Sequence, residues 1–186
     1  MADETNRRKK NGKAAFISNG WKDIVVCAVI LSVPMLLPAF GLSKTDAQFM
    51  KKAAEANMTE AHLGQMAEAQ ASQQSAKDFG QTLSKDHTSA YESLTVLANK
   101  MGEAIPKAIG RDKTIERLMH LKGKAFDRAF TQDEIQSHKS AIALFKNEVE
   151  HGENTDVKAW AKTMISTLEG HLQTAENIAR AETAHR

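Results

Sequence analysis

After Ser43 the sequence is dominated by one pattern: apolar residues recur at alternating steps of three and four positions along four long stretches. This spacing places them on one face of an α-helix. Glycine (10) and proline (3) are scarce among the 186 residues, as in helical proteins. One-sided helices must bury that face against one another, and a chain of this length supports one core. The pattern therefore predicts a single all-α domain, built as an antiparallel four-helix bundle.

Turn-forming residues predict where these helices begin and end. Ser43 and Asp46 stand at the spacing of a capping box, and Thr131 and Glu134 form a second one. Gly102 and Pro106 mark a loop between the second and third stretches. The expected helices are 43–70, 75–101 with Ser75 as its cap, 112–151 with a bend near Gly123 and a new start at Thr131, and 156 to near the C-terminus.

The N-terminal part of the chain has a different character. Residues 24–43 (IVVCAVILSVPMLLPAFGLS) carry no charge and match the ~20 residues that a helix needs to span a bilayer. A basic run, RRKK at 7–10, precedes them and should stay in the cytoplasm. The sequence therefore predicts a basic cytoplasmic segment (1–23), a hydrophobic helix that is a signal peptide or a transmembrane anchor (24–43), and a periplasmic bundle domain (44–186).

Two fates of segment 24–43 are open. Ala39 and Gly41 have the spacing of a signal-peptidase site, and cleavage near Gly41 would release a soluble periplasmic domain. The apolar run is equally long enough for an anchor in the cytoplasmic membrane. If it is retained, the membrane is one partner, and a protein partner in the envelope is expected as well.

Charge and cysteine usage narrow the function. The formal net charge is only +2, and the basic residues that exceed the acidic ones lie before residue 24. The predicted bundle therefore lacks the basic stripe that nucleic-acid binding requires, which excludes nucleic acid as a partner. Cys27, the single cysteine, lies in the hydrophobic segment, so a metal in the bundle would need histidine or carboxylate ligands.

Each predicted apolar stripe is interrupted at one position, and these positions are Glu60, His87, His138 and His171. A carboxylate or imidazole in a core costs several kcal/mol unless it finds a partner. All four lie near the middle of their helices, so we expect them to converge. Three imidazoles and a carboxylate suit a first-row divalent metal ion such as Zn, Fe, Mn, Cu or Ni. The alternative is a cluster that binds no metal and only fixes the register of the helices.

Three further acids are secondary candidates for the same site. Glu134 precedes His138 by one turn and is expected to be a fifth ligand or an imidazole partner. Asp86 and Asp127 are candidates to orient histidines from outside, and the alternative for all three acids is an ordinary solvated side chain. The motif Glu148-x-x-His151 has the spacing found in di-iron bundles, but it stands at a helix end without a second copy, and we set it aside.

Several segments carry a resemblance when they are taken in order: Phe49-x3-Ala53-Ala54-x5-Glu60, Leu83-Ser84-Lys85-Asp86-His87, Gly123-x2-Phe126-Asp127-x10-His138-x6-Phe145 and Leu168-x2-His171-Leu172. Together they resemble an exported bacterial family of unknown function over residues 46–180. Members of that family, often labelled outer-membrane proteins, are ferritin-like four-helix bundles with no assigned reaction. The resemblance implies this fold and export, and it leaves the chemistry open. Similar proteins usually have proline where Thr167 stands here, which affects only local helix geometry.

Three functions are consistent with these features. The first is a periplasm-facing bundle that binds a metal for storage, sensing or envelope stress. The second is a membrane-anchored structural or accessory subunit of a larger envelope complex, with no metal. The third is an enzyme with a mononuclear metal and an open coordination position. No nucleophile elbow, phosphate loop or dinucleotide fingerprint is present in the sequence, and the paired Glu-x-x-His motifs of di-iron proteins are missing.

Overall fold

The computed structural model describes residues 42–184, and within that range the chain is all-helical, with no β-strand. The helices are α1 (Lys44–Gln70), α2 (Gln74–Met101), α3 (Lys113–Leu118), α4 (Gly123–His151) and α5 (Thr155–Ala184). This confirms the all-α prediction. Segment 1–23 and all of segment 24–43 except its last two residues lie outside the described residues, so the boundaries predicted there stay predictions. No helix between residues 42 and 184 has the length and hydrophobicity needed to cross a membrane.

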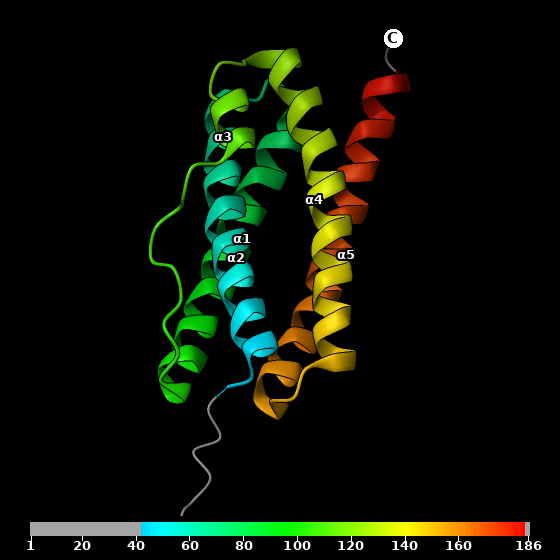
Figure 1. Cartoon of the computed structure of the whole chain (residues 1–186). Coiled ribbons are helices and arrows are strands. Elements are labelled where there is room, and N and C mark those ends of the chain that lie inside the picture. Colours follow the sequence, from blue (N-terminus) through cyan, green and yellow to red (C-terminus); the bar gives the residue numbers. More distant parts are fainter. Residues whose placement is uncertain (1–41, 185–186) are drawn as a thin grey trace, which may run out of the picture. The chain divides into compact units, whose positions relative to one another are not determined.

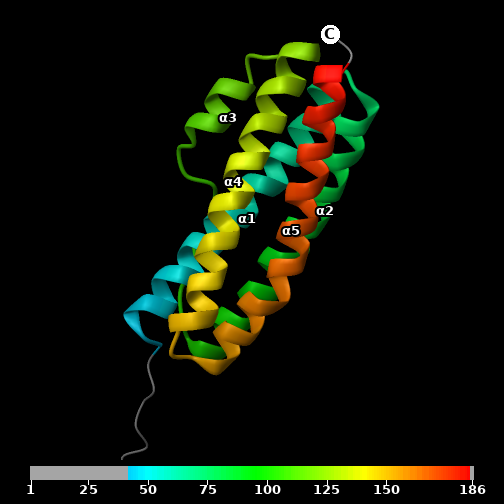
Figure 2. The same ribbon diagram turned by 90° about the vertical axis from the view of Figure 1, so that its right-hand side faces the viewer.

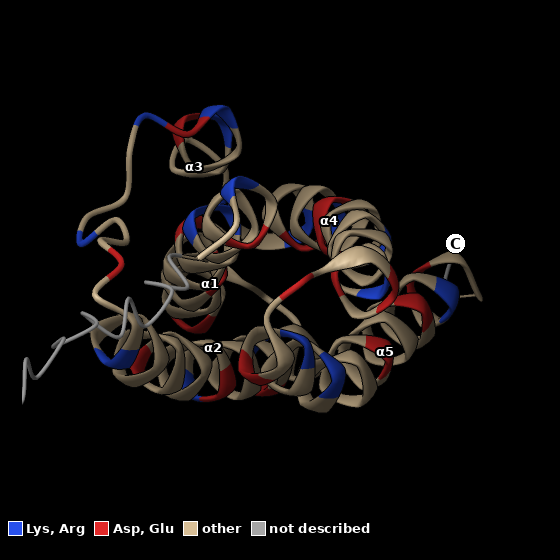
Figure 3. Cartoon of the chain, turned by 60° about the horizontal axis from the view of Figure 1, so that its bottom comes forward, with Lys and Arg blue, Asp and Glu red and all other residues tan. Residues whose placement is uncertain are grey.

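The four long helices pack as two antiparallel hairpins, α1 with α2 and α4 with α5 (Figure 1). The hairpins face each other, because α1 also contacts α4 and α2 also contacts α5. Seen from the end, the helices follow the order α1, α2, α5, α4 around a central space (Figure 3). The short α3 packs on the outside of α4 (Figure 2). Side chains of all four long helices can therefore meet on one axis.

A pair of glycines brings α1 and α2 into backbone contact. A Cβ atom added at Gly64 would lie 2.4 Å from the carbonyl oxygen of Gly80, and one added at Gly80 would lie 2.6 Å from the carbonyl oxygen of Gly64. No L side chain fits at either distance. The first hairpin is therefore closed more tightly than ordinary side-chain packing permits.

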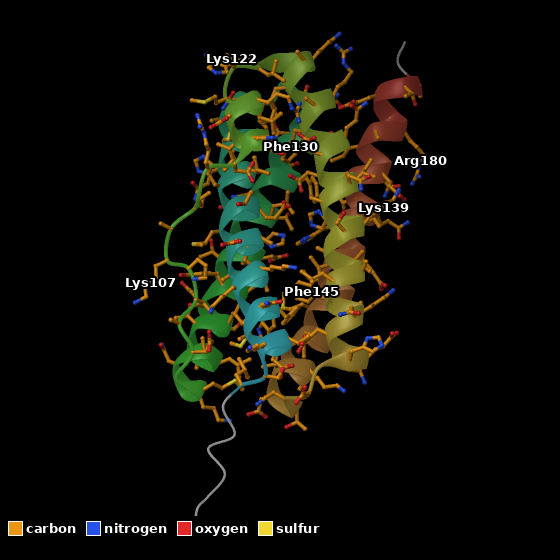
Figure 4. The ribbon with its side chains drawn as sticks, in the orientation of Figure 1. Lys107, Lys122, Phe130, Lys139, Phe145 and Arg180 are labelled. Carbon is orange, nitrogen blue, oxygen red and sulfur yellow. The ribbon has the colours of Figure 1, made fainter. Side chains whose placement is uncertain are left out.

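The apolar core between the hairpins is divided into two clusters. One cluster includes Phe79 and Phe130, and the other includes Phe49 and Phe145. Figure 4 shows Phe130 and Phe145 pointing into the space between the hairpins at different levels. Along every long helix, residues of one cluster precede the middle and residues of the other follow it. The middle level of the core is left for polar side chains.

The predicted N-cap at Ser43 is confirmed, because the Ser43 hydroxyl accepts a hydrogen bond of 3.0 Å from the backbone N–H of Asp46. The Asp46 carboxylate itself accepts from the backbone N–H groups of Glu153 and Asn154. The predicted cap at Ser75 was wrong: α2 begins at Gln74, and no side chain caps it from Gln73. The predicted start at Thr131 was also wrong. Its hydroxyl donates to the Asp127 carbonyl (2.8 Å) inside a continuous α4. The break comes earlier, at Gly123, where φ is +58°.

Candidate metal centre

The three histidines predicted on separate helices meet in the middle level of the core. His87 comes from α2, His138 from α4 and His171 from α5, and all three are buried. One ring nitrogen from each lies within 4.8 Å of the other two. The closest pair is Nε2 of His138 and Nδ1 of His171, at 3.3 Å. The arrangement is a compact set of three imidazole nitrogens, supplied by both hairpins.

The second nitrogen of His87 is fixed by Asn57 of α1. Nδ1 of His87 lies 2.9 Å from Oδ1 of Asn57, and the amide nitrogen of Asn57 donates to the Ala53 carbonyl at 2.8 Å. Because the amide nitrogen is already used, Oδ1 is the acceptor and His87 Nδ1 is the donor. Nε2 of His87 therefore carries a lone pair, and this buried atom has no hydrogen-bond partner.

The other two histidines follow the same rule. His138 Nδ1 donates to the backbone carbonyl of Glu134 (2.9 Å), and His171 Nε2 donates to a carboxylate oxygen of Asp86 (3.0 Å). In the neutral rings, the inner nitrogens then present lone pairs that face each other at 3.3 Å. Two lone pairs at that distance repel unless a cation lies between them. The geometry thus calls for a metal ion or a proton.

Burial favours the uncharged histidines that metal binding requires. It lowers the pKa of His87 well below its usual range, and the neighbouring His138 and His171 add to this effect. Burial also lowers the pKa of His171, against an opposing contribution from the hydrogen bond to Asp86. A metal ion would therefore displace few protons from these two rings.

Two buried glutamates form a second group beside the first. Glu60 of α1, Glu134 and His138 place ligand atoms within 4.8 Å of one another. Glu134 Oε2 lies 3.3 Å from Nδ1 of His138, the nitrogen that faces away from His171. Glu60, predicted as the fourth member of the histidine cluster, thus groups with Glu134 and His138 but not with His87 and His171.

Burial also raises the pKa values of these two carboxyl groups. The pKa of Glu134 rises to about 7, and burial together with the nearby Glu134 raises that of Glu60 well above its usual range. The pair therefore holds protons near neutral pH. At neutral pH it carries less negative charge than two ordinary glutamates would.

The secondary candidates Asp86 and Asp127 have different partners in the structure. Asp86 accepts from His171 and so stands where an orienting residue was expected. Asp127 does not: its carboxylate accepts from the backbone N–H groups of Ser72 (2.8 Å) and Gln73 (3.2 Å), and from the Ser72 hydroxyl. This corrects the sequence-based expectation, because Asp127 holds the α1–α2 turn instead of a histidine.

Asn57 is a functional residue that the sequence reasoning missed. It precedes Glu60 by three positions, so it lies on nearly the same face of α1, and this spacing was the available signal.

The Glu148-x-x-His151 motif at the end of α4 does not bring its two side chains into one site. Glu148 is buried, and its pKa is raised by burial and by Asp46, whereas His151 is exposed. The remaining histidines in the described range are half-buried (His62) or exposed (His120).

The model of a family described as "Domain of unknown function (DUF4142)" matches residues 34–178. A comparison with curated proteins found no match. Among solved structures, the chain is similar to a DUF305 fragment from Deinococcus radiodurans, with a TM-score of 0.67 and 13% identity over 75% of this chain and 98% of that one. It is also similar to CopM in its Cu(II)-bound form, with a TM-score of 0.64 and 14% identity over 73% and 96% of the two chains.

Two more solved structures share the fold. CopM in its Cu(I)-bound form has a TM-score of 0.63 and 16% identity, over 75% of this chain and 98% of that one. A DUF305 protein from Streptomyces coelicolor, described as a candidate secreted protein, has a TM-score of 0.62 and 13% identity, over 72% and 91% of the chains. At these identities the likeness shows the fold alone.

Proposed function

We propose that this chain, which belongs to the DUF4142 family, is an exported, periplasm-facing protein that binds a first-row divalent metal ion through His87, His138 and His171. One observation carries the proposal. One ring nitrogen from each of three histidines converges in the core, and the opposite nitrogen of each ring is held by an acceptor. Such outer hydrogen bonds fix the tautomer and increase the basicity of a metal-binding histidine.

The distances fit a metal ion of this class. Ligand bonds of ~2.0–2.1 Å in a tetrahedral site place two nitrogens about 3.3 Å apart, the separation between His138 Nε2 and His171 Nδ1. The third nitrogen lies within 4.8 Å of the others, so the His87 ring must close by about 1.5 Å at most. Its Nε2 has no competing partner to hold it back.

The donor set suggests which metal to test first. Imidazole nitrogens suit Zn, Cu, Fe and Ni, and for a given nitrogen site the divalent series is tightest at Cu(II). No thiol is present among residues 42–184. CopM, which shares the fold, is described in copper-bound and silver-bound forms, and this supports copper as the first choice over zinc.

Two parts of the proposal concern the rest of the chain. The two facing hairpins support assignment of residues 44–186 to a ferritin-like four-helix bundle. The uncharged segment 24–43 behind a basic flank supports export, either with cleavage near Gly41 or with the segment retained as an anchor. Cell fractionation tests this part, and full-length protein found soluble in the cytoplasm would contradict it.

The metal is tested on the chain purified from the bacterial envelope without a histidine tag. We expect bound metal by elemental analysis, and a melting temperature that rises with Cu(II) or Zn(II) and falls with chelator. A ligand at a hundred times its Kd adds about 2.7 kcal/mol to the folded state. His138→Ala and His171→Ala should abolish the response, whereas the exposed His120→Ala should keep it.

The same experiment decides between the metal and a purely structural cluster. If a proton bridges His138 and His171 and no metal binds, the layer serves only to set helix register. The wild-type melt would then be indifferent to both metal and chelator, and the purified protein would contain no metal. That result would overturn the metal-binding function and favour a structural or accessory subunit.

A further inference from the structure

A cavity of about 270 Å³ lies beside the histidine cluster, lined by all four long helices. Most of its wall is apolar and comes from Ala56, Ala141, Leu144, Phe145 and Leu168. An apolar cavity of roughly 150 Å³ is enough to hold benzene. The space here is therefore large enough for one six-membered ring with a small substituent.

Two buried polar atoms at this cavity have no partner. His87 and Glu60 both line it, and Nε2 of His87 and Oε2 of Glu60 make no hydrogen bond. An unsatisfied buried polar group costs about 1–3 kcal/mol, so each favours a ligand that supplies the missing bond. Nε2 of His87 needs a donor, as its Nδ1 already donates to Asn57. An ionised guest is excluded, because the apolar wall offers no compensation for its charge.

We propose that this cavity binds a small aromatic alcohol, a single ring that carries one hydroxyl group. The ring fills the apolar part, between Phe145 and Leu168. The hydroxyl can donate to Nε2 of His87, and Glu60 lines the same cavity with an atom that also lacks a partner. The site requires no metal ion, so the inference goes beyond the proposed function and does not rest on it.

The test uses the full-length chain after chelator treatment, with 4-fluorophenol as the probe and fluorine NMR as the readout. Fluorobenzene, which lacks the hydroxyl group, is the matched ligand. We expect 4-fluorophenol to bind at least about fivefold more tightly, since one hydrogen bond in a buried site contributes on the order of 1 kcal/mol or more. Equal binding of the two probes, or binding of neither, would overturn the proposal.

Variants place the probe in the cavity. Ala141→Leu should abolish binding by filling the space, whereas Ala129→Leu, the same change on α4 beside the other core cluster, should leave it intact. Undiminished binding to Ala141→Leu would place the ligand elsewhere and overturn the proposal. Glu60→Leu provides a second test if Ala141→Leu does not fold. It should reduce the preference for 4-fluorophenol over fluorobenzene, and an unchanged preference would also overturn the proposal.

A Cu(II) titration of a second wild-type sample that contains no fluorophenol separates the two proposals, because both use Nε2 of His87. Metal uptake without fluorophenol binding would overturn the cavity inference and leave the proposed function standing. Fluorophenol binding without metal uptake would overturn the proposed metal-binding function and leave the cavity inference standing.

Discussion

Oδ1 of Asn57 accepts a hydrogen bond from Nδ1 of His87 at 2.9 Å, and this contact decides which nitrogen of the ring faces the other two histidines. Asn57 cannot reverse the roles, because its amide nitrogen is occupied by the Ala53 carbonyl one turn earlier on α1. The helix backbone thus orients the amide, and the amide orients the imidazole. A residue that would not touch the metal determines whether His87 presents a lone pair to it.

Asn57→Leu should therefore weaken metal binding while leaving all three histidines in place. Without the acceptor, His87 can adopt the other tautomer, and loss of such an outer partner typically costs 10–100-fold in metal affinity. A competition titration with a chromogenic chelator measures the change. Asn99→Leu, on the exposed face of α2, is the control and should bind as the wild type does. Equal affinities for the two variants would show that Asn57 does not act on the site.

Replacing glycine by alanine should have opposite effects at Gly64, which lies in the contact between α1 and α2, and at Gly170, which lies on α5. Gly64→Ala puts a Cβ atom 2.4 Å from the Gly80 carbonyl oxygen, and we expect it to destabilise the protein by about 1–3 kcal/mol or more as the helices separate. Gly170→Ala meets no atom within 4 Å on α5 and should stabilise by up to about 1 kcal/mol through helix propensity. Urea unfolding of both variants measures these differences. A neutral Gly64→Ala would mean that the hairpin is less tightly closed.

The stripes show how much of this architecture the sequence determines. The period of apolar residues places Glu60, His87, His138 and His171 on the inner faces, and all four are buried at the middle level. Two helix starts were mispredicted: Thr131 lies inside α4, where its hydroxyl bonds the Asp127 carbonyl, and the chain just before α2 is held by a residue far away in sequence. The N–H groups at the start of α2 are bonded by Asp127, 54 and 55 positions later. Local capping rules contain no information about such a contact.

The sequence predicts which residues lie at the site, but it does not predict which of their atoms contact one another. A stripe gives the face of a helix, but it does not give the rotamer that groups Glu60 with Glu134 and His138. Which ring nitrogen points inward depends on the acceptor that holds the opposite nitrogen. Asn57 on α1 accepts from His87 on α2, and Asp86 on α2 accepts from His171 on α5. These are tertiary facts, and spacing along one helix does not encode them.

The buried Glu148 predicts that stability falls as the pH rises. Burial, the hydrogen bond with Asp46 and the charge of Asp46 raise its pKa from 4.5 to about 7 in the folded protein. Between these values the folded state holds a proton that the unfolded state has lost, so the free energy of unfolding decreases from pH 4.5 to about 7 and is then constant with respect to this group.

Glu148→Gln cannot ionise and should remove this part of the pH dependence. Relative to wild type, it should gain roughly 1–3 kcal/mol at pH 8 compared with pH 4.5. The exposed Glu150→Gln is the matched control and should follow the wild type at both pH values. Urea unfolding across this pH range measures the slopes. Parallel curves for Glu148→Gln and wild type would contradict a raised pKa at this position.

Asp86 and Asp127 offer a way to separate metal binding from folding with one type of substitution. Asp127 is fully buried and satisfies two backbone N–H groups and a hydroxyl at the α1–α2 turn, so Asp127→Ala leaves these donors unpaired and should cost roughly 2–5 kcal/mol. Since Asp127 contacts no histidine of the cluster, the metal affinity of the folded Asp127→Ala protein should stay unchanged.

Asp86→Ala removes the acceptor of His171 near the surface and should have the opposite effects, with little loss of stability and a 10–100-fold loss of metal affinity. Both quantities are measured on each variant, by urea unfolding of the metal-free protein and by chelator competition at a temperature where both are folded. If Asp127→Ala also lowered the metal affinity, or Asp86→Ala left it intact, the outer hydrogen bond of His171 would not be what prepares its Nδ1 for a metal ion.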